Sequence, residues 1–293
     1  MITRFDHAVI AVRDLDDAVR RYRDLGFDVV VGGRHPEMGT HNAIIRFGLE
    51  YIELLAVADE AEAIASGAKG RVLVNFLRQR SGGLAGYAVA ARQIEEDAER
   101  FRRTGLAAEG PFAMSRRRPD GNILSWRLLV PTGVAWRRPW PFLIEWDAPD
   151  DQRLAWEPPG VHPNGATGVR SVAEAVSDLG WASDLYRRQL GLGPGDEDDA
   201  IDLGARRATF RLGAFRIDLL APVADGVLAR VLAKTGEGPF ELTLTVRDRA
   251  EAAAVLARAG IPLEDVPIDP TTICVPLKAG LGARLVLTEQ RGC

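Results

Sequence analysis

The hydrophobic and polar positions repeat a simple arrangement: an apolar strand, a helix with one apolar face, and further strands. Residues 13–27 show the helix most clearly. Asp14 can accept hydrogen bonds from the open N–H groups at its start, and Gly26 supplies a left-handed stop. Its apolar positions fall on one face at helical spacing: Leu15, Ala18, Val19, Tyr22 and Leu25. The pattern therefore predicts a capped amphipathic helix in this segment.

The segments after this helix are typical of strands. Residues 27–31, 43–47 and 51–56 are short, rich in branched residues and separated by glycine turns. One unit is thus strand, helix and three strands, or βαβββ. The same layout returns from residue 92, from residue 177 and, more weakly, from residue 247. Because both faces of the strands carry apolar residues, we expect helices on one side of the sheet and a lined concavity on the other.

The four units group into two halves. Units 1 and 2 occupy residues 1–149 with a helical stretch at 58–82 between them, and units 3 and 4 occupy residues 164–293. Residues 150–163 are rich in proline and glycine and are predicted to be a linker. The predicted fold class is α+β, with four βαβββ units forming two paired, half-open sheet cups. Since each half can close its own cup, a monomer suffices; a dimer is the alternative.

Composition and charge narrow the class of protein. A chain of 293 residues with 46% hydrophobic and 27% charged residues is typical of a globular protein of two domains. The 37 Lys and Arg against 41 Asp and Glu give a charge of −4, which argues against nucleic acid or an anionic membrane as partner. No apolar run is long enough for a membrane helix or a signal peptide, so we expect a cytoplasmic protein.

Three stretches carry a family resemblance. They are D-H-A-V-I-A-V-R-D-L from Asp6, G-G-R-H-P-E-M-G-T-H-N-A from Gly32, and P-F-L-I-E-W ending at Trp146. With the four-unit layout, the chain resembles the vicinal oxygen chelate (VOC) superfamily over nearly its whole length. Residues 5–149 resemble the superfamily's glyoxalase-like domain branch. The superfamily includes glyoxalases, extradiol dioxygenases, epimerases, antibiotic-resistance proteins and metal-free binders, so the resemblance implies a fold more narrowly than an activity.

The resemblance also implies a set of metal ligands. In members that hold a metal, the first and last strands of each paired unit supply one ligand each. Carried over by position, this gives His7, Glu53 and Glu145, while Gly86 stands where a fourth ligand would be. One imidazole and two carboxylates suit one divalent ion such as Fe, Mn, Zn or Ni. The missing fourth ligand leaves open that no metal is bound.

The two carboxylates also raise a physical question of their own. Glu53 and Glu145 lie inside apolar strand runs, where an unpaired carboxylate is costly. A cation, a protonated partner or a bound ligand would compensate. The alternative is that His7 and Glu53 hydrogen-bond each other at the bottom of the cup.

Other residues are candidates for the rim of the same cup. His41 and Asn42 enter a strand beside a glycine-rich turn and are candidates for substrate binding, with His41 or Glu145 moving a proton. Further substrate-binding candidates are Arg116, Arg118 and Trp126. His35, before Pro36, is expected outside the cup. In the second half the matching positions hold Ser171, Asp218 and Glu241, so that half is predicted to be a degenerate, mainly structural partner.

Two functions follow as hypotheses. In the first, a divalent metal supports a lyase, isomerase or dioxygenase that acts on a chelating oxygen substrate. In the second, a metal-free binding or resistance-type protein holds an apolar small molecule without catalysis. Both place a small-molecule ligand in the cup of the first half.

Overall fold

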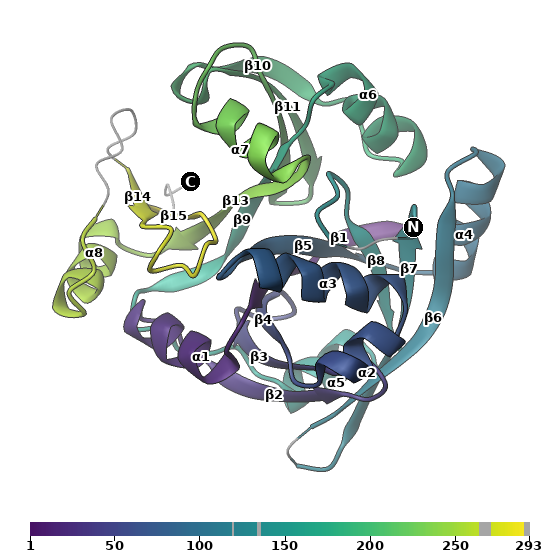
Figure 1. Ribbon diagram of the computed structural model, residues 1–293, viewed down its shortest axis with the longest axis horizontal. Helices are drawn as coiled ribbons and strands as arrows, with labels where there is room; N and C mark the ends of the chain where they lie inside the picture. Colours follow the sequence, from purple (N-terminus) through teal and green to yellow (C-terminus); the bar gives the residue numbers. More distant parts are fainter. Residues whose placement is uncertain (119, 134–135, 264–270, 290–293) are drawn as a thin grey trace.

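The computed structural model describes residues 1–118, 120–133, 136–263 and 271–289. In the first half, eight strands form a closed barrel in the order β1-β4-β3-β2-β6-β7-β8-β5 (Figure 1). The strands are β1 (Ile2–Val12), β2 (Val30–His35), β3 (Thr40–Arg46), β4 (Tyr51–Val57), β5 (Gly82–Ala91), β6 (Ala108–Arg117), β7 (Ile123–Pro131) and β8 (Phe142–Trp146). The α+β fold class is confirmed.

Two helices of the first half begin after an aspartate whose side chain caps the first turn. The helices of this half are α1 (Leu15–Asp24), α2 (Glu60–Ala65), α3 (Ala68–Gln79) and α4 (Ile94–Arg103). Asp14 accepts a hydrogen bond from the backbone N–H of Asp17 at 2.8 Å. Gly26 follows α1 with φ of +81°, a conformation that side chains with a Cβ disfavour. The helical stretch predicted at 58–82 folds as two helices, α2 and α3.

The first cup is closed further than expected. Strands β2 and β6 complete the ring, and the two strands pair through one residue pair, Arg34 with Arg117. Elsewhere the ring has long pairings, as between β1 and β5. The space enclosed by the ring is therefore a pocket rather than an open trough.

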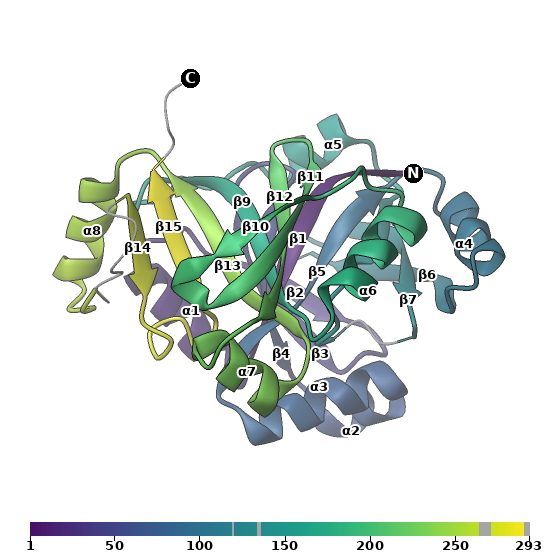
Figure 2. The same cartoon turned by 90° about the horizontal axis from the view of Figure 1, so that it is seen from above.

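The second half forms an open sheet of seven strands in the order β10-β11-β12-β9-β13-β15-β14 (Figure 2). These strands are β9 (Ala166–Ala175), β10 (Asp196–Ala200), β11 (Ala205–Leu212), β12 (Phe215–Pro222), β13 (Gly238–Val246), β14 (Thr272–Val275) and β15 (Leu285–Glu289). Its helices are α6 (Leu179–Asp184), which continues as a π-helical turn over Leu185–Gln189, α7 (Val227–Thr235) and α8 (Arg249–Arg258).

Part of the predicted linker is folded. Helix α5 (Asp150–Trp156) lies within it, and the Arg153 guanidinium sits 3.9 Å from the centre of the Trp146 ring. Arg153 is 1% exposed. The ring of His162 is fixed by the backbone N–H of Asp28 and the carbonyl of Arg46, each at 3.0 Å. Residues 150–163 therefore pack on the barrel and belong to its structure.

The two halves share one hydrophobic core. The rings of Phe5 and Phe215 stack with centroids 4.3 Å apart, and the hydroxyls of Tyr87 and Tyr186 are 2.6 Å apart in a buried position. The buried cluster that contains these rings includes residues from both sheets. Apolar burial therefore holds the halves together. No helix in the described part of the chain is long and apolar enough to cross a membrane.

Candidate functional site

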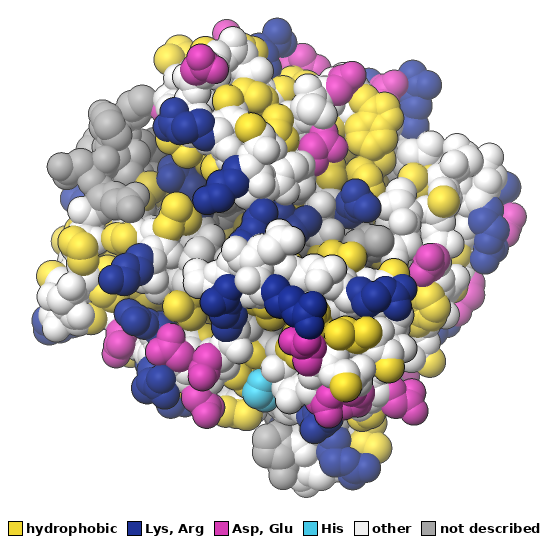
Figure 3. Space-filling model, viewed as in Figure 1, with side chains coloured by type: hydrophobic (Ala, Val, Ile, Leu, Met, Phe, Trp, Pro, Cys, Tyr) yellow, Lys and Arg dark blue, Asp and Glu magenta, His cyan; other side chains and the backbone are white. Residues whose placement is uncertain are grey.

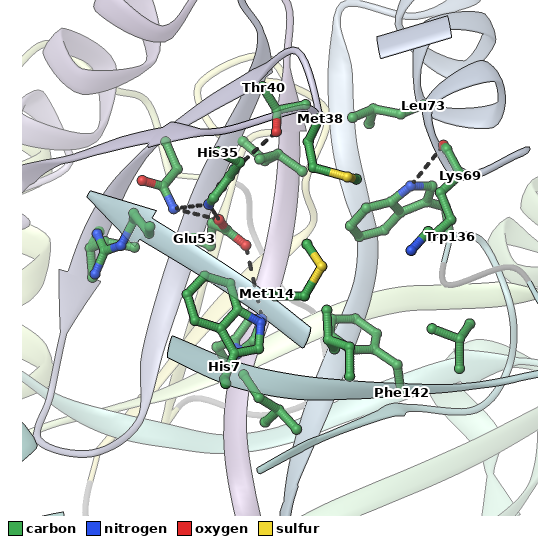
Figure 4. Close-up of a pocket in the computed structure, with 18 of the residues that line it drawn as sticks. His7, His35, Met38, Thr40, Glu53, Lys69, Leu73, Met114, Trp136 and Phe142 are labelled. Atoms are coloured by element: carbon green, nitrogen blue, oxygen red, sulfur yellow. Dashed lines mark hydrogen bonds and ion pairs between the residues drawn. The ribbon is translucent and has the colours of Figure 1, made fainter. Parts of the chain in front are cut away.

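The barrel encloses a pocket of about 100 Å³ with mainly apolar walls (Figure 4). All strands of the barrel except β5 contribute to it, and the N-terminal turns of α3 contribute Lys69, Gly70 and Leu73. The larger apolar side chains in the wall are Met38, Leu55, Met114, Trp126, Leu128, Trp136, Phe142 and Trp146. An apolar cavity with a few converging polar groups is the usual form of a small-molecule site.

The polar groups gather at one end of the pocket. His7, His35, Asn42 and Glu53 are all buried there, and Figure 4 shows both imidazoles directed toward Glu53. The Nε2 atom of His7 is 3.9 Å from Oε2 of Glu53, and the Nε2 atom of His35 is 3.7 Å from Oε1. The Asn42 amide donates to Oε1 of Glu53 at 2.5 Å. Glu53 is thus the centre of the polar end.

Asp6 sets the tautomer of His7. Between Phe5 and His7, the pairing of β1 with β5 contains a bulge in which Asp6 is the extra residue. A bulge re-aims side chains, and Asp6 Oδ1 comes within 2.8 Å of His7 Nδ1. Because a carboxylate only accepts, Nδ1 donates this hydrogen bond. In the neutral ring Nε2 therefore carries the lone pair that faces Glu53.

The Asp6 carboxylate is itself held firmly. It is fully buried and accepts hydrogen bonds from Arg4 at 2.9 Å and from the Trp146 indole at 3.1 Å. Burial alone would raise the pKa of Asp6, but the hydrogen bond from His7 and the charges of Arg153, His7 and Arg4 outweigh burial. The pKa of Asp6 is held well below its ordinary value, so the group is an anion at neutral pH.

His35 is neutral, and its acceptor nitrogen already receives a hydrogen bond from within the protein. The Asn42 amide nitrogen lies 3.3 Å from His35 Nε2, so Nε2 accepts and Nδ1 donates to the Thr40 hydroxyl at 2.9 Å. Burial lowers the pKa of His35, and the charge of Glu53 opposes that shift only in part. The acceptors left for a ligand are therefore His7 Nε2 and Glu53 Oε2, which are 3.9 Å apart.

The prediction that Glu145 faces this pocket is wrong. Its neighbours Ile144 and Trp146 line the pocket, whereas Glu145 lies on the opposite face of β8. There its carboxylate accepts from the backbone N–H groups of Gln93 at 3.1 Å and Ile94 at 2.8 Å. Glu145 therefore caps the N-terminus of α4. Its carboxylate therefore lies outside the pocket in which a metal or catalytic role was predicted for it.

For the two histidines of the β2–β3 hairpin, the predicted positions inside and outside the pocket are reversed. His41 does not line the pocket, and the carboxylates that act on its ring are Asp16 and Asp14 at the start of α1. It therefore points toward the helix-covered outside and cannot move a proton in the pocket. His35, expected outside, lies inside, because a bulge between Val31 and Gly33 shifts the alternation of β2.

Of the remaining substrate-binding candidates, three line the pocket and one does not. Asn42, Arg116 and Trp126 line the pocket, but Arg118 does not. Arg116 donates to Glu157 Oε1 at 2.5 Å, and Arg118 lies 3.7 Å from the same oxygen. Sequence reasoning missed Glu157 because it falls in the predicted linker. This carboxylate holds Arg116 at the pocket wall.

The residues present do not fit the implied metal. With Glu145 outside and Gly86 at the fourth position, two of the implied ligands meet, His7 and Glu53. The Nε2 lone pair of His35 accepts a hydrogen bond from Asn42. Within the described residues no group of three His, Cys, Asp or Glu side chains could hold an ion. The pocket therefore offers the Glu53 carboxylate and one free imidazole nitrogen, His7 Nε2. These groups are suited to proton transfer.

The second half has a polar cavity instead of an apolar pocket. It measures about 400 Å³, and Ser171, Asp218 and Glu241 line it as their positions predicted. The Thr209 hydroxyl donates to Asp218 at 2.6 Å, and Arg284 Nε donates to Glu241 at 2.7 Å. Both carboxylates thus have partners within the protein.

Gly32 gives a direct test of how closely the polar end is packed. A Cβ at Gly32 would lie 2.1 Å from Asn42 Oδ1 and 2.6 Å from Arg116 Nη1. Gly32→Ala is therefore expected to displace Asn42 from Glu53 and to weaken ligand binding by about tenfold, the effect of losing one charge-assisted hydrogen bond. Quenching of tryptophan fluorescence by a bound ligand measures this. Gly193→Ala is the control, since a Cβ there meets nothing within 4 Å; equal affinities of the two variants would contradict the argument.

Comparison with known proteins identifies the family. Residues 5–177 match the glyoxalase-like domain family. This match covers more than half of the chain, so the protein belongs to that family, within the VOC superfamily that the sequence resembles. The matched range includes helix α5 and the rest of the predicted linker, in agreement with their packing on the barrel. No curated protein matches the chain.

Solved structures agree on the fold. A hypothetical protein from Staphylococcus aureus shares 13% identity with a TM-score of 0.69, covering 98% of this chain and 99% of its own. A variant of 4-hydroxymandelate synthase from Streptomyces coelicolor shares 13% identity with a TM-score of 0.67, covering 100% of this chain and 94% of its own. Methylmalonyl-CoA epimerase from Mycobacterium tuberculosis shares 26% identity over 45% of this chain and 93% of its own, with a TM-score of 0.41. The two long matches show that the fold extends over the whole chain.

Proposed function

We propose that the first half binds a small, mainly apolar molecule and removes a proton from it. The observation that carries the proposal is the pair of free acceptors, His7 Nε2 and Glu53 Oε2, 3.9 Å apart at the polar end of an apolar pocket. Two buried acceptors that face each other need a hydrogen between them. A ligand with an acidic hydrogen, such as an enolisable ketone, supplies it.

In this proposal each pocket residue has a separate role. Glu53 takes the proton and His7, fixed by Asp6, stabilises the protonated state. Arg116 lines the pocket with a positive charge, and it can stabilise the negative charge that develops on the carbonyl oxygen. The tryptophans and Leu73 exclude water, which strengthens these interactions. No step uses a metal, because the side chains present do not complete a metal site.

A small ketone provides the test. Acetophenone has an apolar ring and methyl hydrogens next to a carbonyl. Tryptophan quenching measures its binding, and NMR in D₂O measures exchange of its methyl hydrogens. Glu53→Gln keeps the shape of the pocket and removes the base, so exchange is expected to fall by about 10²-fold or more. Glu145→Gln makes the same chemical change outside the pocket and is expected to retain exchange.

Metal removal distinguishes the two original hypotheses. Dialysis against EDTA is expected to leave both binding and exchange unchanged. Loss of exchange that Mn²⁺ or Zn²⁺ restores would contradict the proposal and favour a metal-dependent enzyme. Binding without any exchange in the native protein would favour the metal-free binding protein, which the mainly apolar lining also supports.

A further inference from the structure

A further cavity lies where the two halves meet. It measures about 560 Å³ and runs between the C-terminal end of α3 and helix α7. Residues 82–84 at the start of β5 line it from the first half, and Pro239 and Phe240 of β13 line it from the second. We call it the seam groove. Because both halves build it, it exists only in the assembled chain.

The seam groove is strongly basic. Its described lining contains five cationic side chains and no carboxylate: Arg80, Arg137, Arg230, Lys234 and Arg284. Figure 3 shows Lys and Arg side chains gathered between α7 and α3. Groups of one charge that line one concave surface focus the electrostatic potential there.

Within the described residues, three of these side chains form neither an ion pair nor a hydrogen bond. Arg284 is paired with Glu241, and Arg137 donates to backbone carbonyls and to Thr235. Arg80, Arg230 and Lys234 form no ion pair within the described part of the chain. Burial lowers the pKa of Arg80, whose guanidinium lies 4.9 Å from the centre of the Phe76 ring. Such charges gain most from a bound anion.

The same groove has an apolar lining. Helix α7 presents Val227 and Val231 on the face that also carries Arg230 and Lys234, as helical spacing requires. Phe76, Phe240 and Leu277 add to this surface, and Val227 and Leu277 are 46% and 50% exposed. Exposed apolar groups beside unpaired cations match a ligand with both properties.

We propose that the seam groove binds a small organic anion that carries two negative charges and an apolar body. An aryl or acyl phosphate has this chemistry. Arg230 and Lys234 from the second half and Arg80 from the first hold the anion, while Val231 and Phe240 contact the apolar body. This site differs from the barrel pocket, although α3 lines both, with Leu73 in the pocket and Phe76 in the groove.

The probe for the test is 1-naphthyl phosphate, titrated by calorimetry into the full chain. Arg230→Gln combined with Lys234→Gln is expected to raise Kd by about tenfold or more, since two charge-assisted contacts are lost. Arg92→Gln combined with Arg103→Gln removes the same charge from exposed, unpaired positions outside the groove and is expected to leave Kd unchanged. Arg80→Gln tests the contribution of the first half, and circular dichroism verifies that each variant is folded.

Two further probes test the ligand class. The neutral 1-naphthol and inorganic phosphate are each expected to bind at least about tenfold more weakly than the combined molecule. Equal binding of 1-naphthyl phosphate by the Arg230/Lys234 variant and the native protein would overturn the proposal. Loss of binding in Glu53→Gln instead would place the probe in the barrel pocket and would also overturn it. Neither result bears on proton exchange from acetophenone, so the two proposals fail separately.

Discussion

Asp6→Asn is expected to destabilise the protein by about 3–5 kcal/mol, the usual cost of breaking a buried ion pair from one side. Asp6 is fully buried, and it lies 3.8 Å from Arg153, which is 1% exposed. In the part of the chain that the structure describes, the Arg153 guanidinium nitrogens have no hydrogen-bond partner, so Asp6 supplies a fully buried compensating charge. Urea denaturation with matched m-values measures the change. Proton exchange by the remaining folded protein should also fall, because His7 loses the group that fixes its tautomer.

Asp150→Asn is the matched control, because Asp150 lies at the same 3.8 Å from Arg153 but is half exposed. Its cost in stability is expected to stay below about 1 kcal/mol.

The stability that Asp6 contributes depends on pH in a definite direction. The pKa of Asp6 is lowered on folding, so its contribution is complete above the unfolded value of about 4 and is lost as the pH falls below it. Native protein and Asp6→Asn should therefore converge in stability below about pH 4, and a constant difference would contradict this account.

Glu174→Gln is expected to stabilise the protein at neutral pH. Glu174 lies on β9 in the core shared by the halves and is fully buried. Neither of its carboxyl oxygens has a hydrogen-bond partner among the described residues. Burial raises the pKa of Glu174 well above its ordinary value, and Arg137 only partly opposes this. Glutamine has the same shape and no ionisable group. We expect a gain of about 1 kcal/mol or more, equivalent to roughly 2–4 °C in Tm, measured by calorimetry.

The gain should depend on pH. A raised pKa means that the folded protein keeps a proton that the unfolded chain releases above about pH 4. The native protein therefore loses stability as the pH rises from that value toward the folded pKa, and Glu174→Gln does not. The two should be equal in stability near pH 4 and diverge at pH 8. Glu251→Gln, at an exposed position on α8, should show no such divergence. Destabilisation by Glu174→Gln at every pH would show that Glu174 is ionised and stabilised by Arg137.

The candidate site was only partly predictable, and the failures have local causes. His7 and Glu53 follow from their positions on the first and last strands of a unit, and they do converge. Glu145 was misplaced because β8 has apolar residues on both faces, so alternation alone did not indicate its direction. One signal was available: α4 has no side-chain cap at Gln93, and its open N–H groups need an acceptor. Glu145 is that acceptor.

His35 and Glu157 were missed for different reasons. His35 stands between turn-forming residues, and the bulge at the glycines that turns it inward is invisible to a pattern of period two. Glu157 is far along the chain from its partners: 41 residues separate it from Arg116 and 111 from Arg46. Nothing in the composition of a proline-rich segment indicates that its carboxylate orients an arginine in the pocket.

The sequence by itself determined the α+β class and the helices that begin at a capping aspartate. These features depend on residues within a few positions of one another, as when Asp14 caps the helix that Gly26 ends. Only the tertiary structure decided which strand residues face the pocket and what each one contacts there. Asp6 bonds the indole of Trp146, 140 residues away, because the ring of strands closes. Closing that ring sets the direction of every strand side chain, and this direction separates Glu53 in the pocket from Glu145 outside it.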